Sequence, residues 1–173
     1  MRVPWNPNIT GDQECLVELV LDAHSILAER NNTSTVAIKV CAQSGCGFDR
    51  AIIGALSTIG ATHAPLEQAM DTLNGSIVYV QGKIPGWGCD FVKGEPEPIW
   101  RDIDTHIMTY NPDIYERMDR ITMALHKAGK KVFPNAACYT AAAAIITKCP
   151  KKLVSWFLIQ GRLSTWAHEF SKQ

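Results

Sequence analysis

The chain has 173 residues, which is enough for one domain with a substantial apolar core. Hydrophobic residues make up 46% of the chain and charged residues 20%, the usual proportions of a globular protein. The 17 Lys and Arg balance the 17 Asp and Glu, so the formal net charge of zero argues against a nucleic acid as the main partner and leaves little repulsion to oppose self-association.

Targeting and metal signals are both missing from the sequence. Residues 1–8 are rich in proline and lack the apolar segment of a signal peptide, and no apolar run reaches the length of a membrane span. The six cysteines form no Cys-x-x-Cys pair and no zinc-like spacing with the histidines. We therefore expect a cytoplasmic protein without a metal, a membrane or nucleic acid among its ligands, whose cysteines are reduced thiols.

Apolar residues at helical spacing predict an all-α fold. The first half is expected to hold four helices, over residues 12–30, about 33–42, 48–59 and 63–73. Asp12 is the expected N-cap of the first helix, and Thr33 or Ser34 that of the second. Ser44, Gly45, Cys46 and Gly47 predict a turn between the second and third helices.

The second half begins with a β-prone run at 77–80, which predicts a short strand or an extended connector. The glycines and prolines of 82–98 predict a loop. Further helices are expected over 112–129, 134–146 and 150–170. Asp102, Asp104 and His106 are interpreted as a solvated helix face, and Trp100, Trp156 and Trp166 as core or interface residues. With neither repeat nor linker, residues 1–173 are expected to form a single compact domain.

His63 is the first candidate for chemistry. Pro65 falls in the first turn of the expected helix, so His63 lies near a helix N-terminus, where the helix dipole lowers the pKa of the imidazole and keeps it neutral. A neutral imidazole can polarise a carbonyl group or donate a hydrogen bond to an enolate. The alternative is a histidine that caps the helix by bonding to its backbone.

The loop from Lys83 to Gly88 is the second candidate. Its glycines let another molecule approach the backbone, Trp87 offers a flat apolar face for an adenine ring, and Lys83 offers a cation for a phosphate. The alternative is a tight structural turn around a buried tryptophan.

Taken in order, His63-Ala64-Pro65-Leu66, Lys83-Ile84-Pro85-Gly86-Trp87-Gly88 and Asn135-Ala136-Ala137 resemble the active-site segments of the citrate synthase and citryl-CoA lyase superfamily. Asn32-Thr33-Ser34-Thr35 and the last helix with Arg162 are also similar to that family. The resemblance implies a small, CoA-handling domain with part of the large domain. It also implies a catalytic role for His63 and a substrate carboxylate on Arg162. For CoA or an acyl-CoA it implies contacts with Lys83, Ile84, Pro85, Gly86, Trp87, Gly88 and Asn135.

The sequence departs from the family pattern at its chemical residues. Cys89 stands where the family has its second catalytic histidine, Ala137 where it has the catalytic aspartate, and Ile99 where it has an arginine that binds a carboxylate. The family's oxaloacetate histidine has no clean match, because His24 is spaced too far from Asn32. Proton abstraction by a positioned base contributes roughly 10²–10⁴-fold, and Ala137 cannot supply it.

The resulting prediction is a degenerate family member without citrate synthase activity. It would bind CoA or acyl-CoA, a protein partner, or both. The short chain and the lost catalytic groups resemble small phage-encoded proteins that redirect host metabolic enzymes, an association that rests on no particular residue, so the partner would be a host metabolic enzyme if the chain is phage-encoded. Whether it is an enzyme stays open. One alternative is an acyl-CoA-dependent acyltransferase or thioesterase that uses Cys89 and His63. Against it stands the interpretation that Cys89 has no chemical role and entered the sequence after catalysis was lost. Another alternative is a citryl-CoA lyase-like enzyme. The missing parts of the large domain predict bare apolar faces covered in a homodimer.

Overall fold

The structure is a computed structural model that describes residues 3–30, 32–60, 64–76, 83–88 and 94–173. These ranges hold helices and isolated bridges but no strand, which confirms the predicted all-α fold. The α-helices are α1 (Gly11–Glu29), α2 (Thr33–Gln43), α3 (Phe48–Ser57), α4 (Leu66–Leu73), α5 (Arg101–Tyr110), α6 (Pro112–Lys127), α7 (Ala136–Ile146) and α8 (Ser155–Ser171). Two 3-10 helices, η1 (Pro98–Trp100) and η2 (Lys151–Leu153), precede α5 and α8.

The first two helices begin at residues other than the predicted caps. Thr10, not Asp12, caps α1: its hydroxyl accepts from the backbone N–H of Gln13, and the Gln13 side chain accepts from the N–H of Thr10. Asn32, not Thr33 or Ser34, caps α2 by accepting from the backbone N–H of Thr35. An amide side chain one residue earlier reaches the free N–H groups of the first turn, so the helix starts sooner.

The start of α4 and the environment of α5 differ from the sequence-based expectations. Helix α4 begins at Leu66, later than predicted, because Pro65 takes the N-cap position. Residues 61–63 and the β-prone run at 77–80 lie outside the described residues. Of the three polar residues expected on a solvated face of α5, Asp102 is exposed, but His106 is buried and lies within hydrogen-bond distance of the backbone oxygen of Asp12, and Asp104 accepts from Tyr139 Oη at 3.0 Å.

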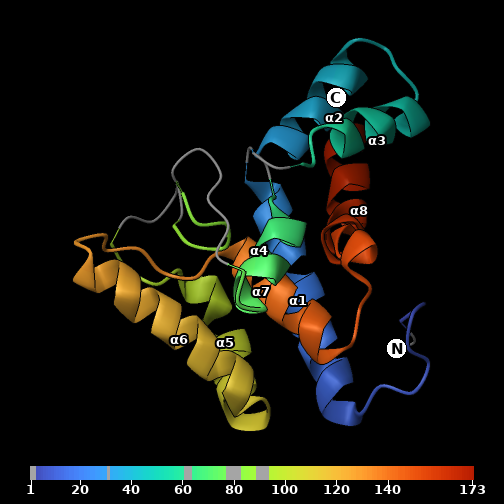
Figure 1. Cartoon of the computed structure of the whole chain (residues 1–173). Coiled ribbons are helices and arrows are strands. Elements are labelled where there is room, and N and C mark those ends of the chain that lie inside the picture. The colour runs from blue at the N-terminus through green and yellow to red at the C-terminus, as the bar shows by residue number, and fades with distance from the viewer. Residues whose placement is uncertain (1–2, 31, 61–63, 77–82, 89–93) are drawn as a thin grey trace.

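Helices α1, α7 and α8 form the centre of the fold, and the pairs α2–α3 and α5–α6 pack against it on different sides (Figure 1). Helix α1 contacts α8, α7 and α5, and α4 lies on α7. Helices α2 and α3 form a hairpin beside the C-terminal part of α8, while α5 and α6 lie together on the other side of α1 and α7. None of the helices in the described part is long and apolar enough to cross a membrane.

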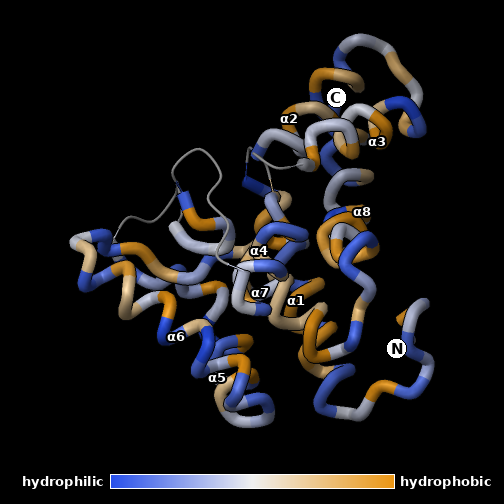
Figure 2. The backbone as a smooth tube through the Cα atoms, viewed as in Figure 1, coloured by the Kyte–Doolittle hydropathy of each residue, from blue (hydrophilic) through white to orange (hydrophobic). Residues whose placement is uncertain are grey.

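The core is centred on helices with small residues at their contacts. Ala141, Ala142, Ala143 and Ala144 of α7 are all fully buried, and the apolar stretches of α1 and α7 lie next to each other in Figure 2. At the crossing of α1 and α8, a Cβ atom on Gly161 would lie 2.6 Å from the backbone oxygen of Leu21. Only glycine allows this approach of the two backbones. As predicted, Trp100 and Trp166 belong to the core.

Candidate functional site

The candidate CoA loop is held against the segment that leads into α7. The backbone N–H of Gly88 donates to the oxygen of Phe133 at 2.9 Å, and that of Asn135 donates to the oxygen of Gly86 at 2.9 Å. Trp87 and Pro134 between them form an isolated antiparallel bridge. The loop therefore has a fixed backbone conformation.

Asn135 is the residue that joins the loop to the helix. Its Nδ2 donates to the backbone oxygen of Gly88 at 2.6 Å, and its Oδ1 accepts from the backbone N–H groups of Ala137 and Cys138 at 2.9 and 3.4 Å. One amide side chain thus caps α7 and fixes the loop. In the sequence Asn135 was important only through its resemblance to the family segment.

Trp87 has a different environment from the one that an adenine platform requires. The side chain is only 6% exposed, and its Nε1 donates to Thr122 Oγ1 of α6 at 2.9 Å. The ring is therefore a core residue with a satisfied polar group, in agreement with the structural alternative. Any ligand contact from this loop has to come from its backbone and from neighbouring side chains instead.

Three exposed lysines lie on the loop or on the segment that follows α6. Lys83 begins it, and Lys130 and Lys131 follow the end of α6. A Cβ atom on Gly88 would lie 3.7 Å from Val132, and one on Gly94 would lie 3.7 Å from Cδ of Lys131, so the segment that carries the two lysines runs beside the loop. Lys130 and Lys131 were not among the residues predicted from the sequence, although the basic run from His126 to Lys131 was the available signal.

The first turn of α7 has no carboxylate at the position that corresponds to the family's catalytic aspartate. Ala137 is buried and presents a methyl group. Cys138 is fully buried against the loop, since a Cβ atom on Gly86, whose φ is +96°, would lie 3.2 Å from Cβ of Cys138. Burial raises the pKa of the Cys138 thiol well above its usual value, so this cysteine is a protonated core residue.

A second part of the candidate site is the buried guanidinium of Arg162 on α8. The residue is 5% exposed, and Nη1 donates to Asn32 Oδ1 at 3.2 Å and to Ser34 Oγ at 2.9 Å. Its Nε is buried without a hydrogen-bond partner, and among the described ion pairs no carboxylate is bound to it. Burial lowers the pKa of Arg162 to about 10. This guanidinium therefore has capacity for an anion.

His24 of α1 lies beside Arg162 and is neutral. Thr140 Oγ1 donates to the backbone oxygen of Ala136 at 2.7 Å, so it accepts from Nε2 of His24, 2.8 Å away. The other ring nitrogen, Nδ1, is buried and unpartnered and carries no proton. Burial, and then the charge of Arg162, lower the pKa of His24 to about 3. The positive charge here thus belongs to Arg162 alone.

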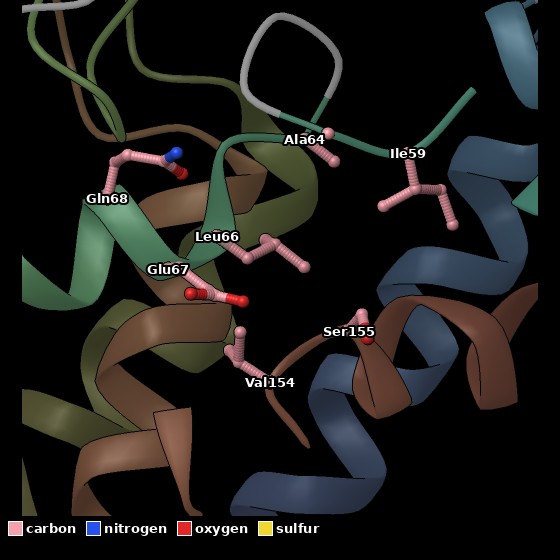
Figure 3. A pocket seen from close by; sticks show the side chains of 8 residues that line it. Ile59, Ala64, Leu66, Glu67, Gln68, Val154 and Ser155 are labelled. Atoms are coloured by element: carbon pink, nitrogen blue, oxygen red, sulfur yellow. The ribbon is translucent and has the colours of Figure 1, made fainter. Parts of the chain in front are cut away.

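A cavity of about 320 Å³ opens where α4 and α8 begin (Figure 3). The side chains of Ile59 and Leu66 extend into it, and Glu67 and Ser155 supply its polar atoms. His63 directly precedes the lining residue Ala64 in sequence but lies outside the described residues, as does Cys89. The catalytic roles predicted for His63 and Cys89 therefore stay predictions.

The position of the family's second carboxylate-binding arginine is occupied by a packed turn. Ile99 belongs to η1, next to Glu97, whose buried carboxylate forms an ion pair with Arg30 and accepts from Trp100 Nε1 at 3.1 Å. In the described residues no three metal-ligating side chains come together.

Two solved structures are similar to the chain. The citryl-CoA lyase of Hydrogenobacter thermophilus superimposes with a TM-score of 0.77 at 19% identity, over 95% of this chain and 70% of that enzyme. The citrate synthase of the archaeon Thermoplasma acidophilum, solved with carboxymethyl coenzyme A and oxaloacetate, superimposes with a TM-score of 0.68 at 16% identity. The match covers 95% of this chain but only 49% of that synthase. No family model and no curated protein sequence matches the chain. The structural likeness shows that the chain has the all-α fold of the citrate synthase and citryl-CoA lyase superfamily.

Proposed function

We propose that the chain binds CoA or an acyl-CoA without catalysing citrate synthesis. The observation that carries the proposal is the arrangement around Asn135. This residue holds the Gly86–Gly88 loop against the first turn of α7, while Ala137 in that turn provides no base. A preserved loop beside an inert helix turn suits recognition of a ligand better than proton abstraction from it.

Charge and fold both support a CoA ligand. Lys83, Lys130 and Lys131 provide cations beside the loop, as the phosphates of CoA require. The similar enzymes act on citryl-CoA or were solved with a CoA derivative. Since the ring of Trp87 is buried, we assign the adenine contact to the backbone of the loop.

Arg162 supports a carboxylate as the second element of the ligand. A buried guanidinium held only by Asn32 and Ser34 keeps Nε free for a charge-assisted hydrogen bond. Because His24 is neutral, Arg162 is the charged member of this pair, and one guanidinium suits one carboxylate. The preferred ligand is therefore an acyl-CoA with a carboxylate in its acyl part, or CoA together with a small carboxylate.

Calorimetric titration with CoA and acetyl-CoA tests the proposal. Because binding to the folded state raises its stability, both ligands should also raise the melting temperature. Reversing the charges of Lys130 and Lys131 to Glu should weaken CoA binding at least about tenfold, since it replaces attraction to the phosphates with repulsion. Reversing the exposed Lys148 and Lys152 to Glu is the matched control and should leave the affinity nearly unchanged. If millimolar CoA produces no heat of binding and no thermal shift, CoA binding is refuted.

The same preparation separates binding from catalysis. If the protein only binds, acetyl-CoA and a series of carboxylated acyl-CoA thioesters stay intact over long incubation, measured as the absence of released thiol. Thiol release that disappears in both Cys89→Ser and His63→Ala would replace the binding proposal with acyl transfer or thioester hydrolysis.

We also propose that the chain self-associates through the outer face of α2 and α3. Val36 and Val40 lie one turn apart on α2, and Ile53 of α3 is 63% exposed, so three apolar side chains face solvent on the hairpin. Light scattering at micromolar concentrations should give the mass of a homodimer, and Val40→Glu should give a folded monomer. A monomer mass for the unmodified protein refutes self-association. Stoichiometric capture of a metabolic enzyme from a bacterial lysate would add a protein partner to the proposal.

A further inference from the structure

Helix α2 ends in a Schellman motif whose two outer residues are both cysteines. The backbone N–H of Cys46 donates to the oxygen of Cys41 at 3.0 Å, and that of Gly45 donates to the oxygen of Ala42 at 2.9 Å. Gly45 takes the left-handed conformation, with φ of +75°. These two bonds and the glycine define the motif, in which the side chains that correspond to Cys41 and Cys46 commonly contact each other.

The hydrogen bond between the two cysteines also limits their separation. Adding the covalent distances from Cα to O in Cys41 and from N to Cα in Cys46 places the two Cα atoms within about 7 Å. Disulfide-bonded cysteines have Cα atoms about 4.4–6.8 Å apart, so a bond between Cys41 and Cys46 needs little backbone movement.

The environment of the pair differs from that of the other described cysteines. Cys41 and Cys46 are half-buried free thiols, so a small reagent can reach them. Sγ of Cys41 lies near α3, 3.2 Å from the position of a Cβ atom on Gly54. Cys138 and Cys149 are buried, and burial raises the pKa of Cys149 to about 11. Cys15 is exposed on α1, outside this motif.

We propose that Cys41 and Cys46 form a reversible disulfide when the protein meets a low-molecular-weight disulfide such as oxidised glutathione. One cysteine thiolate attacks the S–S bond of oxidised glutathione, which gives a mixed disulfide and one glutathione thiolate. The second cysteine thiolate attacks the protein sulfur of this mixed disulfide, forms the Cys41–Cys46 bond and releases the second glutathione. The two thiol protons pass to the released glutathione thiolates, so one glutathione disulfide is reduced as two protein thiols are oxidised. The inference is independent of the proposed CoA function.

Peptide mapping provides a direct test. Trypsin cleavage after Lys39 and Arg50 gives a peptide of residues 40–50 that contains both cysteines and no others. After the native protein is equilibrated with glutathione buffers and alkylated, this peptide should be lighter than its reduced form by two hydrogen atoms and carry no alkyl group. Cys15, alone in the peptide of residues 3–30, is the internal control and should show only a glutathione adduct or an alkyl group.

Two comparisons separate a preorganised pair from simple proximity in sequence. The effective concentration of the two thiols in the native protein should exceed that in a synthetic peptide of residues 40–50 by at least about tenfold. Gly45→Ala should lower it, because alanine is strained at this φ and loosens the motif. Gly129→Ala, at the equivalent glycine after α6, is the matched control and should leave the effective concentration of the two thiols unchanged. Glutathione adducts on both cysteines without the linked peptide, or equal effective concentrations in protein and peptide, would overturn the proposal.

Discussion

Replacing Arg162 with methionine should stabilise the ligand-free protein. Arg162 is 5% exposed, and its buried Nε has no hydrogen-bond partner. Burial lowers its pKa from 12.5 to about 10, and at 1.36 kcal/mol per pH unit this disfavours the charged form by about 3 kcal/mol. Methionine replaces the aliphatic part of the arginine side chain, is shorter than arginine and carries no charge. Asn32 Oδ1 still accepts from Ser34 Oγ and from the N–H of Thr35, while Ser34 Oγ keeps the bond that it donates and loses the one that it accepts from Arg162.

The expected gain is smaller than the whole cost of the charge, because two hydrogen bonds from a charged donor are lost. We expect the free energy of unfolding to rise by roughly 1–3 kcal/mol, within the range found when buried charges are replaced by apolar residues. The melting temperature should rise by about 2–4 °C for each kcal/mol in a chain of this size. Urea unfolding followed by circular dichroism measures the change. The same variant should lose any thermal shift caused by a small dicarboxylate such as malonate.

Arg30→Met is the matched control, because it removes a guanidinium with a structural partner. Arg30 pairs with Glu97, whose side chain is 4% exposed, while its own side chain is 34% exposed. Its loss leaves a buried carboxylate without this partner and should destabilise the protein by roughly 2–4 kcal/mol. If Arg162→Met destabilises the protein by a similar amount, Arg162 is a structural residue, and the interpretation as an anion site is wrong.

The neutral state of buried His24 makes stability depend on pH. Its pKa is lowered from 6.5 to about 3, so below pH 6.5 the unfolded state binds a proton that the folded state does not. Stability should fall by about 2 kcal/mol from pH 7.5 to pH 5.0, and His24→Gln should show a smaller loss in urea unfolding at the two pH values. Gly161→Ala should destabilise the protein by roughly 1–3 kcal/mol, since its Cβ would lie 2.6 Å from the backbone oxygen of Leu21. Gly54→Ala is the control and should have little effect, because its Cβ meets only the side chain of Cys41. Equal melting temperatures for the two variants would contradict this. Thr122→Val should cost about 1–2 kcal/mol, because it leaves the buried Nε1 of Trp87 unpaired, and unchanged stability would show that this bond is unimportant.

The elements that local signals specify were predicted from the sequence. Asn111 followed by Pro112 correctly placed the start of α6, and the glycine after the second helix correctly marked its turn. The true cap of α1 was also visible, because Thr10 and Gln13 have the spacing of a capping box. Asp12 was preferred only because aspartate is a common cap.

The errors concern contacts between distant parts of the chain. The burial of Trp87 depends on Thr122 of α6, and the inward orientation of Asp104 depends on Tyr139 of α7. Neither contact has a signal in the local sequence, since a polar residue on a helix and a tryptophan in a glycine-rich loop fit both a solvated and a packed environment. The resemblance identified Arg162, but its neutral partners on α2 follow only from the packing of α8 against that helix.

The buried alanines of α7 have a consequence for the order in which the protein opens. A helix whose residues from Ala137 to Ala144 are all buried cannot expose its backbone to water while its neighbours stay in place. Its amide hydrogens should therefore exchange with deuterium only through global unfolding, at the slowest rates in the chain. Helices α2 and α3, with solvent-facing valine and isoleucine side chains, can separate from α8 without disturbing α7. In the monomeric Val40→Glu variant, where no partner covers the hairpin, their faster exchange would mark the hairpin as a separate cooperative unit.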